Sequence, residues 1–192
     1  MKLTSVLSML ILAGTVTLTG CVAAVGAGAA AGAVTAIDRR SAGTVVDDQI
    51  IELKLFSALV GDREISKQAH VNATSYNNMV LLSGEVPNEQ LRRRAAEVAR
   101  AHPKVRGVYN ELSLAAPSSL LTRSSDTVIT GKVKSSLVTD KYVAATRVKV
   151  VTENGTVFLL GLVTRDEAQR ATEVARRVGG VQRVVKLFEY IN

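Results

Sequence analysis

Two segments of the chain carry apolar residues at every fourth position, which is the spacing of one face of a helix. The six positions are Ile51, Leu55, Leu59, Ile129, Val133 and Leu137. Because residues four apart project from the same side of a helix, each set predicts a helix with one buried stripe. Asp48 and Asp126 begin the two segments, where a side chain that caps the first turn is expected.

Each helical segment is followed by the pattern of a β-hairpin. In residues 148–163 valines alternate with polar residues, and Asn154-Gly155 is a strong signal for a two-residue turn. Residues 71–86 follow the same pattern with a weaker Asn-Asn turn. Gly84 and Gly161 recur at equivalent points late in the returning strands. Glycine inside a strand often marks a bulge or a close approach of backbone, so we expect a backbone requirement at both positions.

Both hairpins are followed by an amphipathic helix and one more strand. The apolar helix positions are Leu91, Ala95, Val98, Ala99, Ala168, Ala171, Val174 and Ala175. Residues 105–114 and 181–191 are the expected final strands. The order helix, strand, strand, helix, strand predicts an α+β fold in which two helices cover one face of a small mixed sheet.

The same three blocks occur twice at nearly constant spacing, so the chain contains one unit in duplicate. The predicted boundaries place the first repeat at residues 47–114 and the second repeat at residues 125–192. Residues 115–124, which include Pro117, form the expected linker.

The N-terminus has the composition of an export signal. Lys2 precedes a short apolar run that ends in Leu18-Thr19-Gly20-Cys21. This ending resembles a bacterial lipobox, which implies that residues 1–20 are a signal peptide and that the Cys21 thiol accepts a lipid. An uncleaved membrane helix is the alternative, but the run is short for a membrane span and contains glycine.

The residues after Cys21 predict a tether. Val22 stands where a signal for retention in the inner membrane would usually have aspartate, so the resemblance implies attachment to the outer membrane, facing the periplasm. Residues 21–46 begin with a run of Ala and Gly that predicts a flexible segment, with a glycine-zipper helix as the alternative. Arg39 and Arg40 are candidates for contact with lipid phosphates.

The two repeats share motifs with a known family. A strand glycine is followed by Glu-Val-Ala-Arg at residues 97–100 and 173–176, and then by a Val-x-x-Val strand. This combination resembles the BON domain, and two such domains behind a lipobox are similar to dual-BON outer-membrane lipoproteins. The resemblance implies phospholipid or membrane binding in the periplasm, a role in envelope integrity and cell division, and no catalytic residues or cofactor.

Composition and motifs argue against an enzyme. One Cys and two His leave little material for a metal centre, and no phosphate-binding loop, dinucleotide fingerprint or His-Glu-x-x-His motif occurs. We predict no metal site and expect His70 and His102 to be solvated surface residues. The basic run at residues 92–94 lacks an aromatic platform, so a nucleic-acid partner is not expected.

Charge distinguishes the repeats and suggests a membrane-facing surface. The first repeat is neutral, whereas the second has eleven basic and seven acidic residues, a net +4. Beyond the core stripe, an apolar strip flanked by lysines runs along the predicted second-repeat helix, as shallow insertion among lipid headgroups requires. The residues of this candidate lipid face are Val128, Gly131, Lys132, Lys134, Ser135, Val138 and Tyr142.

Two interpretations of this strip remain open. It contacts an anionic phospholipid membrane, or it packs against the first repeat, where the corresponding Ile50, Leu53 and Val60 are also apolar. At the level of function, the alternative to a lipid-binding module is an adaptor that docks on an outer-membrane assembly or peptidoglycan-remodelling protein.

Overall fold

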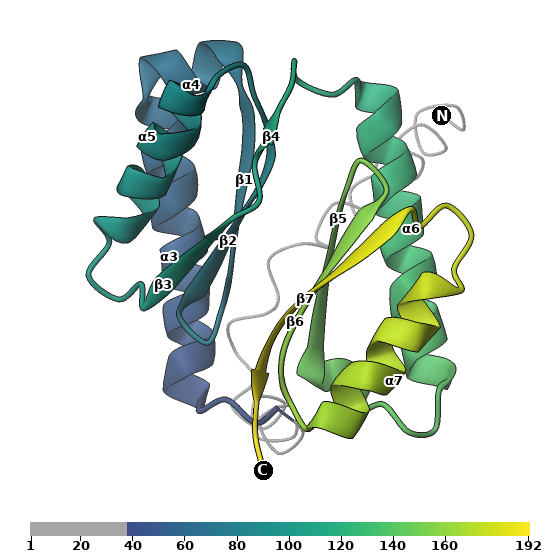
Figure 1. Cartoon of the computed structure of the whole chain (residues 1–192). Coiled ribbons are helices and arrows are strands. Elements are labelled where there is room, and N and C mark those ends of the chain that lie inside the picture. The colour runs from purple at the N-terminus through teal and green to yellow at the C-terminus, as the bar shows by residue number, and fades with distance from the viewer. Residues whose placement is uncertain (1–37) are drawn as a thin grey trace, which may run out of the picture. The chain divides into compact units, whose positions relative to one another are not determined.

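The computed structural model describes residues 38–192 (Figure 1). The predicted signal peptide, Cys21 and most of the predicted tether lie outside the described residues. Among the helices that are described, none is long and apolar enough to cross a membrane.

The first repeat has the predicted order of elements with two small additions. Its elements are α3 (Ala42–Gly61), α4 (Arg63–Gln68), β1 (His70–Tyr76), β2 (Met79–Val86), α5 (Glu89–Arg100), β3 (Gly107–Asn110) and β4 (Ser113–Leu114). Strand β2 is central: β1 pairs with it antiparallel, and β3 and β4 pair with it in parallel. The predicted final strand is therefore split into two short pieces.

The second repeat follows the same plan. Its elements are α6 (Leu120–Thr139), the short helix η1 (Ala145–Arg147), β5 (Val148–Glu153), β6 (Thr156–Val163), α7 (Arg165–Arg176) and β7 (Arg183–Tyr190). The sheet order is β5-β6-β7, with an antiparallel hairpin and a parallel third strand. The predicted α+β architecture, two repeated units with a small mixed sheet, is confirmed.

The first helix of each repeat begins earlier than the predicted boundary. Helix α3 starts at Ala42 and α6 at Leu120, so residues 42–46 and 120–124 are helical, not tether or linker. Serine is the reason in both copies: the hydroxyl of Ser41 accepts a hydrogen bond from the Thr44 N–H, and Ser119 does the same for α6. Such a cap satisfies a first-turn N–H that has no partner within the helix.

Both hairpins close through the predicted two-residue turns. Asn77 and Asn78 have φ of 53° and 62°, and Asn154 and Gly155 have φ of 46° and 68°. Positive φ at both central residues defines the type I′ turn, whose twist matches that of the flanking strands. Asparagine tolerates this left-handed conformation better than most residues, which explains why Asn-Asn replaces Asn-Gly in the first repeat.

The two aspartates predicted as helix caps have a different role. Asp48 and Asp126 lie inside α3 and α6 and are 1% and 5% exposed. The Asp48 carboxylate accepts hydrogen bonds from the backbone N–H groups of Asn77 and Asn78, each at 2.8 Å. The cap prediction is wrong because the true caps lie a full two turns upstream, which leaves the aspartates free to hold the hairpin turns.

The expected backbone requirement at the two strand glycines is confirmed. Gly84 has φ of +115°, and a Cβ atom there would lie 2.0 Å from the carbonyl oxygen of His70. At Gly161 the added Cβ would lie 2.5 Å from the carbonyl oxygen of Arg147. No relaxed Cβ contact is that short, so both copies need glycine where the hairpin strands approach closely.

Helices cover one face of each sheet (Figure 1). Along β6, Val157, Leu159 and Val163 alternate into a core with the predicted α6 stripe. Val80, Leu82 and Val86 of β2 do the same with the stripe of α3. All six predicted stripe residues are buried. The predicted core faces of the first helices are therefore confirmed.

The opposite faces of the two sheets meet in a third cluster. Its buried members are Tyr76, Leu81, Phe158, Leu160 and Leu187. Leu81 and Phe158 belong to the alternate set of positions on β2 and β6, so β6 is apolar on both faces, whereas β2 continues this face with Ser83 and Glu85. The repeats thus pack through their sheets, not through the strip on α6.

Candidate functional site

All seven residues of the candidate lipid face are exposed to solvent. Val128 is 55%, Val138 71% and Tyr142 76% exposed. The interpretation that this strip packs against the first repeat is wrong, because the sheet faces already make that contact. Whether the exposed strip binds lipid stays a prediction.

Basic side chains and grooves flank the strip. Lys132 borders a groove of about 440 Å³ between α6 and α7, which Arg170 and Arg177 also line. Lys134 and Val138 border a second groove, of about 370 Å³. The exposed apolar residues therefore stand beside cationic groups, an arrangement compatible with anionic headgroups.

Tyr142 is positioned at the C-terminal end of the strip by a small polar network. Arg170 donates to the carboxylate of Asp140 and lies 5.5 Å from the centre of the Tyr142 ring. The hydrogen bond from Arg170 lowers the pKa of Asp140, and the N–H of Tyr142 also donates to this carboxylate. The aromatic ring is thus held beside the guanidinium group while most of it faces solvent.

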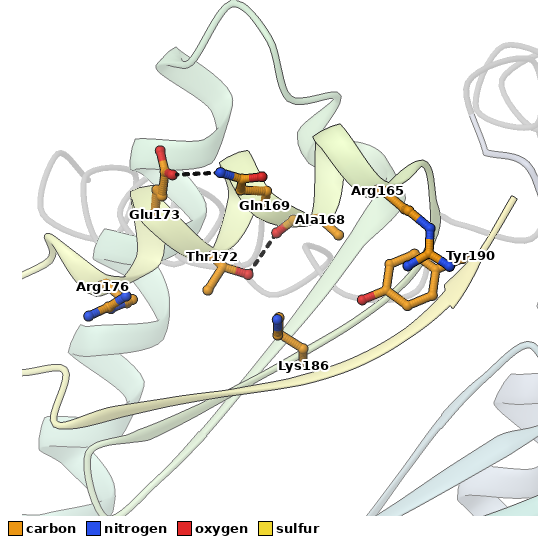
Figure 2. Close-up of a pocket in the computed structure, with 8 residues that line it drawn as sticks. All are labelled: Arg165, Ala168, Gln169, Thr172, Glu173, Arg176, Lys186 and Tyr190. Atoms are coloured by element: carbon orange, nitrogen blue, oxygen red, sulfur yellow. Dashed lines mark hydrogen bonds between the residues drawn. The ribbon is translucent and has the colours of Figure 1, made fainter. Parts of the chain in front are cut away.

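A third groove, also lined by basic residues, lies between α7 and β7 (Figure 2). It has a volume of about 400 Å³ and is lined by Arg165, Arg176 and Lys186 together with one acid, Glu173. Arg165 stacks 5.0 Å from the ring centre of Tyr190. The sequence indicated a net charge of +4 for this repeat. Only the packing of α7 on β7 brings these three cations together.

Helix α3 also exposes an apolar surface. Leu53, Phe56 and Val60 are 70%, 65% and 55% exposed, and Val46 and Ile50 continue the same surface. Yet α3 contains three acidic residues and one basic residue, a net −2, whereas α6 contains three basic residues and one acidic residue, a net +2. The two helices therefore differ in formal charge, but each acid of α3 is paired with a cation from another element, namely Lys104, Arg40 and Lys149. The sequence pattern did not single out Phe56, because the equivalent residue of the second repeat is Lys134.

The two arginines expected to touch lipid are engaged in the protein. Arg39 donates to the Glu167 carboxylate at 2.6 Å and to the carbonyl of Leu162. Arg40 donates to Asp48 at 2.8 Å and lies 4.0 Å from the centre of the Tyr76 ring. The expectation of lipid contact is therefore not met: the arginines tie residues 38–40 to both repeats.

Among the acidic residues that the structure describes, Glu167 has the largest shift in pKa. Partial burial opposes its ionisation, but hydrogen bonds from Arg39, the backbone of Thr164 and Arg147 prevail and lower its pKa to about 2. The Thr164 side chain and Glu167 also form a reciprocal capping box at the start of α7. This carboxylate therefore joins the N-terminal segment to the second repeat.

His70 is not the solvated surface residue expected from the sequence. Its side chain is 18% exposed, and its Nδ1 lies 3.2 Å from Glu85 of the first repeat and 3.6 Å from Glu153 of the second. Burial raises the pKa of Glu153, while the nearby His70 opposes that effect. These groups meet because His70 pairs with Glu85 across the hairpin and because the two sheets pack together. Neither contact can be recognised from the local sequence.

Comparison with known proteins accounts for the duplicated fold. The BON domain model matches residues 47–116 and again residues 125–192. The chain is 42% identical over 183 residues to the outer membrane lipoprotein DolP of Haemophilus influenzae, covering 95% of each chain. It is 39% identical over 155 residues to a 21 kDa hemolysin of Actinobacillus pleuropneumoniae, covering 81% of this chain and 80% of the relative.

A third relative is more distant. The osmotically-inducible protein Y of Escherichia coli strain K12 is 32% identical over 145 residues, covering 74% of this chain and 72% of the relative. Two BON matches, the observed fold and identity along nearly the whole chain agree with one another. The chain belongs to the BON domain family and is a lipid-anchored outer-membrane lipoprotein similar to DolP.

Proposed function

We propose that the protein is a non-enzymatic membrane module that binds anionic phospholipid through its second repeat, on the periplasmic side of the outer membrane. The observation that carries the proposal is the exposed strip on α6, where Val128 and Val138 lie between Lys132 and Lys134 and Tyr142 follows in the next turn. We assign to this binding a role in supporting outer-membrane integrity, including at division sites.

The physical argument combines shallow insertion with charge attraction. Apolar side chains that leave water gain about 25 cal/mol per Å² of buried area. Each lysine or arginine close to an anionic surface adds about 1 kcal/mol, which salt weakens. The strip on α6 offers both contributions at once, whereas α3 contains only one basic residue, Lys54.

Vesicle co-sedimentation tests the proposal. The fragment 38–192 is suitable because it contains all three apolar clusters and lacks the acylation site, so any binding comes from the folded repeats. We expect it to sediment with vesicles that contain phosphatidylglycerol and to remain in solution with phosphatidylcholine alone. Equal binding to both vesicles, or binding to neither, would overturn the proposal.

A second candidate function is supported by α3. Its exposed Leu53, Phe56 and Val60 form an apolar surface that lacks the cationic flank of the α6 strip, because α3 contains a single basic residue. A protein partner with an apolar surface would match it, such as an outer-membrane assembly or peptidoglycan-remodelling factor. Photo-crosslinkers placed at Phe56 and at Tyr142 distinguish the two functions: a discrete protein adduct at Phe56 supports the adaptor, and lipid adducts at Tyr142 support the membrane module.

A further inference from the structure

Three potential metal ligands meet where the two sheets pack. His70 on β1 and Glu85 on β2 come from the first repeat, and Glu153 at the end of β5 comes from the second. One ligand atom from each lies within 4.8 Å of the other two. Glu85 is 1% and Glu153 is 8% exposed, so two carboxylates share a buried site with one imidazole.

Two of the three distances between these ligand atoms fit a small divalent cation. The Nδ1 atom of His70 lies 3.2 Å from Oε2 of Glu85, but 3.6 Å from Oε1 of Glu153, which exceeds hydrogen-bonding distance. Zinc bonds of about 2.0–2.1 Å place adjacent tetrahedral ligand atoms about 3.3–3.5 Å apart. Both separations from His70 lie close to that edge length, and the two carboxylate oxygens lie within 4.8 Å of each other.

Both carboxylates also accept hydrogen bonds from surrounding donors. The amide of Asn72 donates to Oε2 of Glu153 at 3.2 Å, and the side-chain amide of Asn154 donates to Oε1 of Glu85. The backbone N–H of Ser118 donates to Oε2 of Glu85 at 3.0 Å. Such outer contacts orient carboxylates that bind a metal, and they hold both glutamates in place at this site.

A second observation points to a ligand. Among the described residues, the hydroxyl of Ser83 is buried and has no hydrogen-bond partner. Ser83 is two residues before Glu85 on β2, so both side chains project from the same sheet face, and it pairs across the strands with Asn72. A buried hydroxyl without a protein partner commonly marks a place for an ion or its water. Next to this face, a cavity of about 320 Å³ is lined by His70, Asn72 and Glu153.

We propose that His70, Glu85 and Glu153 form a binding site for a divalent transition metal, with Zn²⁺ as the best match. One nitrogen and two carboxylate oxygens leave the fourth tetrahedral position to water from the adjoining cavity. Arg123 and Asp126 also line this cavity, so the two glutamates, Asp126 and Arg123 together carry a formal charge of −2, which a divalent cation neutralises. Because the ligands come from both repeats, the metal fastens one repeat to the other.

Calorimetric titration with Zn²⁺ alone tests the site in the mature, acylated chain held in detergent. We expect one ion per chain and at least a tenfold weaker affinity after Glu153→Gln or His70→Gln. His102→Gln is the matched control, since His102 lies in the loop after α5 and is the other histidine of the chain. Absence of zinc binding, or equal binding by His70→Gln and wild type, would overturn the proposal.

Imidazole NMR on the unmodified protein covers the case in which a variant fails to fold. Zn²⁺ should shift the His70 ring signals and leave those of His102 in place, and the melting temperature should rise with Zn²⁺ concentration because the ion binds only the folded chain. Shifts confined to His102, or no shift in either ring, would contradict the assignment. Mg²⁺ at the same concentration is the control for a general ionic effect.

Discussion

The carboxylate of Asp126 accepts a hydrogen bond from the backbone N–H of Gly155 at 2.8 Å, which ties helix α6 to the turn between β5 and β6. Its other oxygen accepts from the N–H of Asn154 at 2.9 Å. Asp48 makes the equivalent pair of bonds in the first repeat. A buried carboxylate that spans helix and hairpin is therefore a structural feature of both copies.

Replacing this carboxylate should destabilise the second repeat. We expect Asp126→Ala to cost about 2–3 kcal/mol, because two turn N–H groups lose a charged acceptor in a buried place. Urea unfolding followed by circular dichroism measures the change. Ser125→Ala, at the exposed neighbouring position, should leave stability within about 0.5 kcal/mol of wild type. Equal stability of both variants would refute the role given to Asp126.

The strand glycine should be intolerant of a side chain. Gly161→Val places Cβ against the carbonyl oxygen of Arg147, so we expect a loss of about 1–3 kcal/mol in the free energy of unfolding. Gly131→Ala is the control: nothing lies within 4 Å of the added Cβ in the middle of α6, and alanine should stabilise the helix by about 0.5–1 kcal/mol. Thermal melts that move in the same direction for both variants would contradict this prediction.

Lowering the pH should weaken the ion pairs that Glu167 forms with Arg39 and Arg147. Its pKa falls from 4.5 to about 2 on folding, so the ionised carboxylate stabilises the protein above pH 4.5, and this contribution is lost as the pH falls toward 2. Between about pH 6 and about pH 2.5, wild type should lose roughly 1 kcal/mol more stability than Glu167→Gln, a figure reduced for solvent screening. Asp166→Asn, at the exposed neighbouring position, should retain the full loss. An identical pH dependence in wild type and Glu167→Gln would exclude this role.

The candidate lipid face can be disrupted without touching the core. Val128→Glu combined with Val138→Glu should reduce binding to anionic vesicles at least tenfold, because two carboxylates oppose Lys132 and Lys134 and remove apolar contact. The matched pair on α3, Ile50→Glu with Val60→Glu, should change binding much less. Circular dichroism verifies folding of each variant. Loss of binding with the α3 pair alone would assign the membrane face to the other repeat.

Anchoring depends on one residue. Cys21→Ser should abolish acylation and either release a soluble periplasmic chain or leave uncleaved precursor, because Cys21 is the only cysteine in the sequence. Metabolic labelling with a fatty acid measures this directly. Persistent label on the variant would mean that the lipid is attached elsewhere.

Local sequence was sufficient for features that depend on neighbours along the chain. The fourfold spacing of Ile129, Val133 and Leu137 identified a buried helix face, and Asn154-Gly155 identified the hairpin turn. Periodicity and turn chemistry report on residues a few positions apart, and duplication repeats the same signal. The order of elements and the core of each repeat therefore followed from the sequence.

Other features depended on contacts between distant residues. The two-faced apolar strand β6 hinted at a second packing surface, but only the tertiary structure placed Phe158 against the first repeat and left Val138 exposed. Likewise, the sequence shows Asp126 only as a polar residue of a helix, whereas the structure shows that it binds the hairpin turn. Periodicity shows that a face is apolar but not what covers it, because the covering surface lies far away in sequence. The sequence by itself determined the repeated fold, whereas packing of one sheet on the other decided which faces remain for membrane, partner or metal.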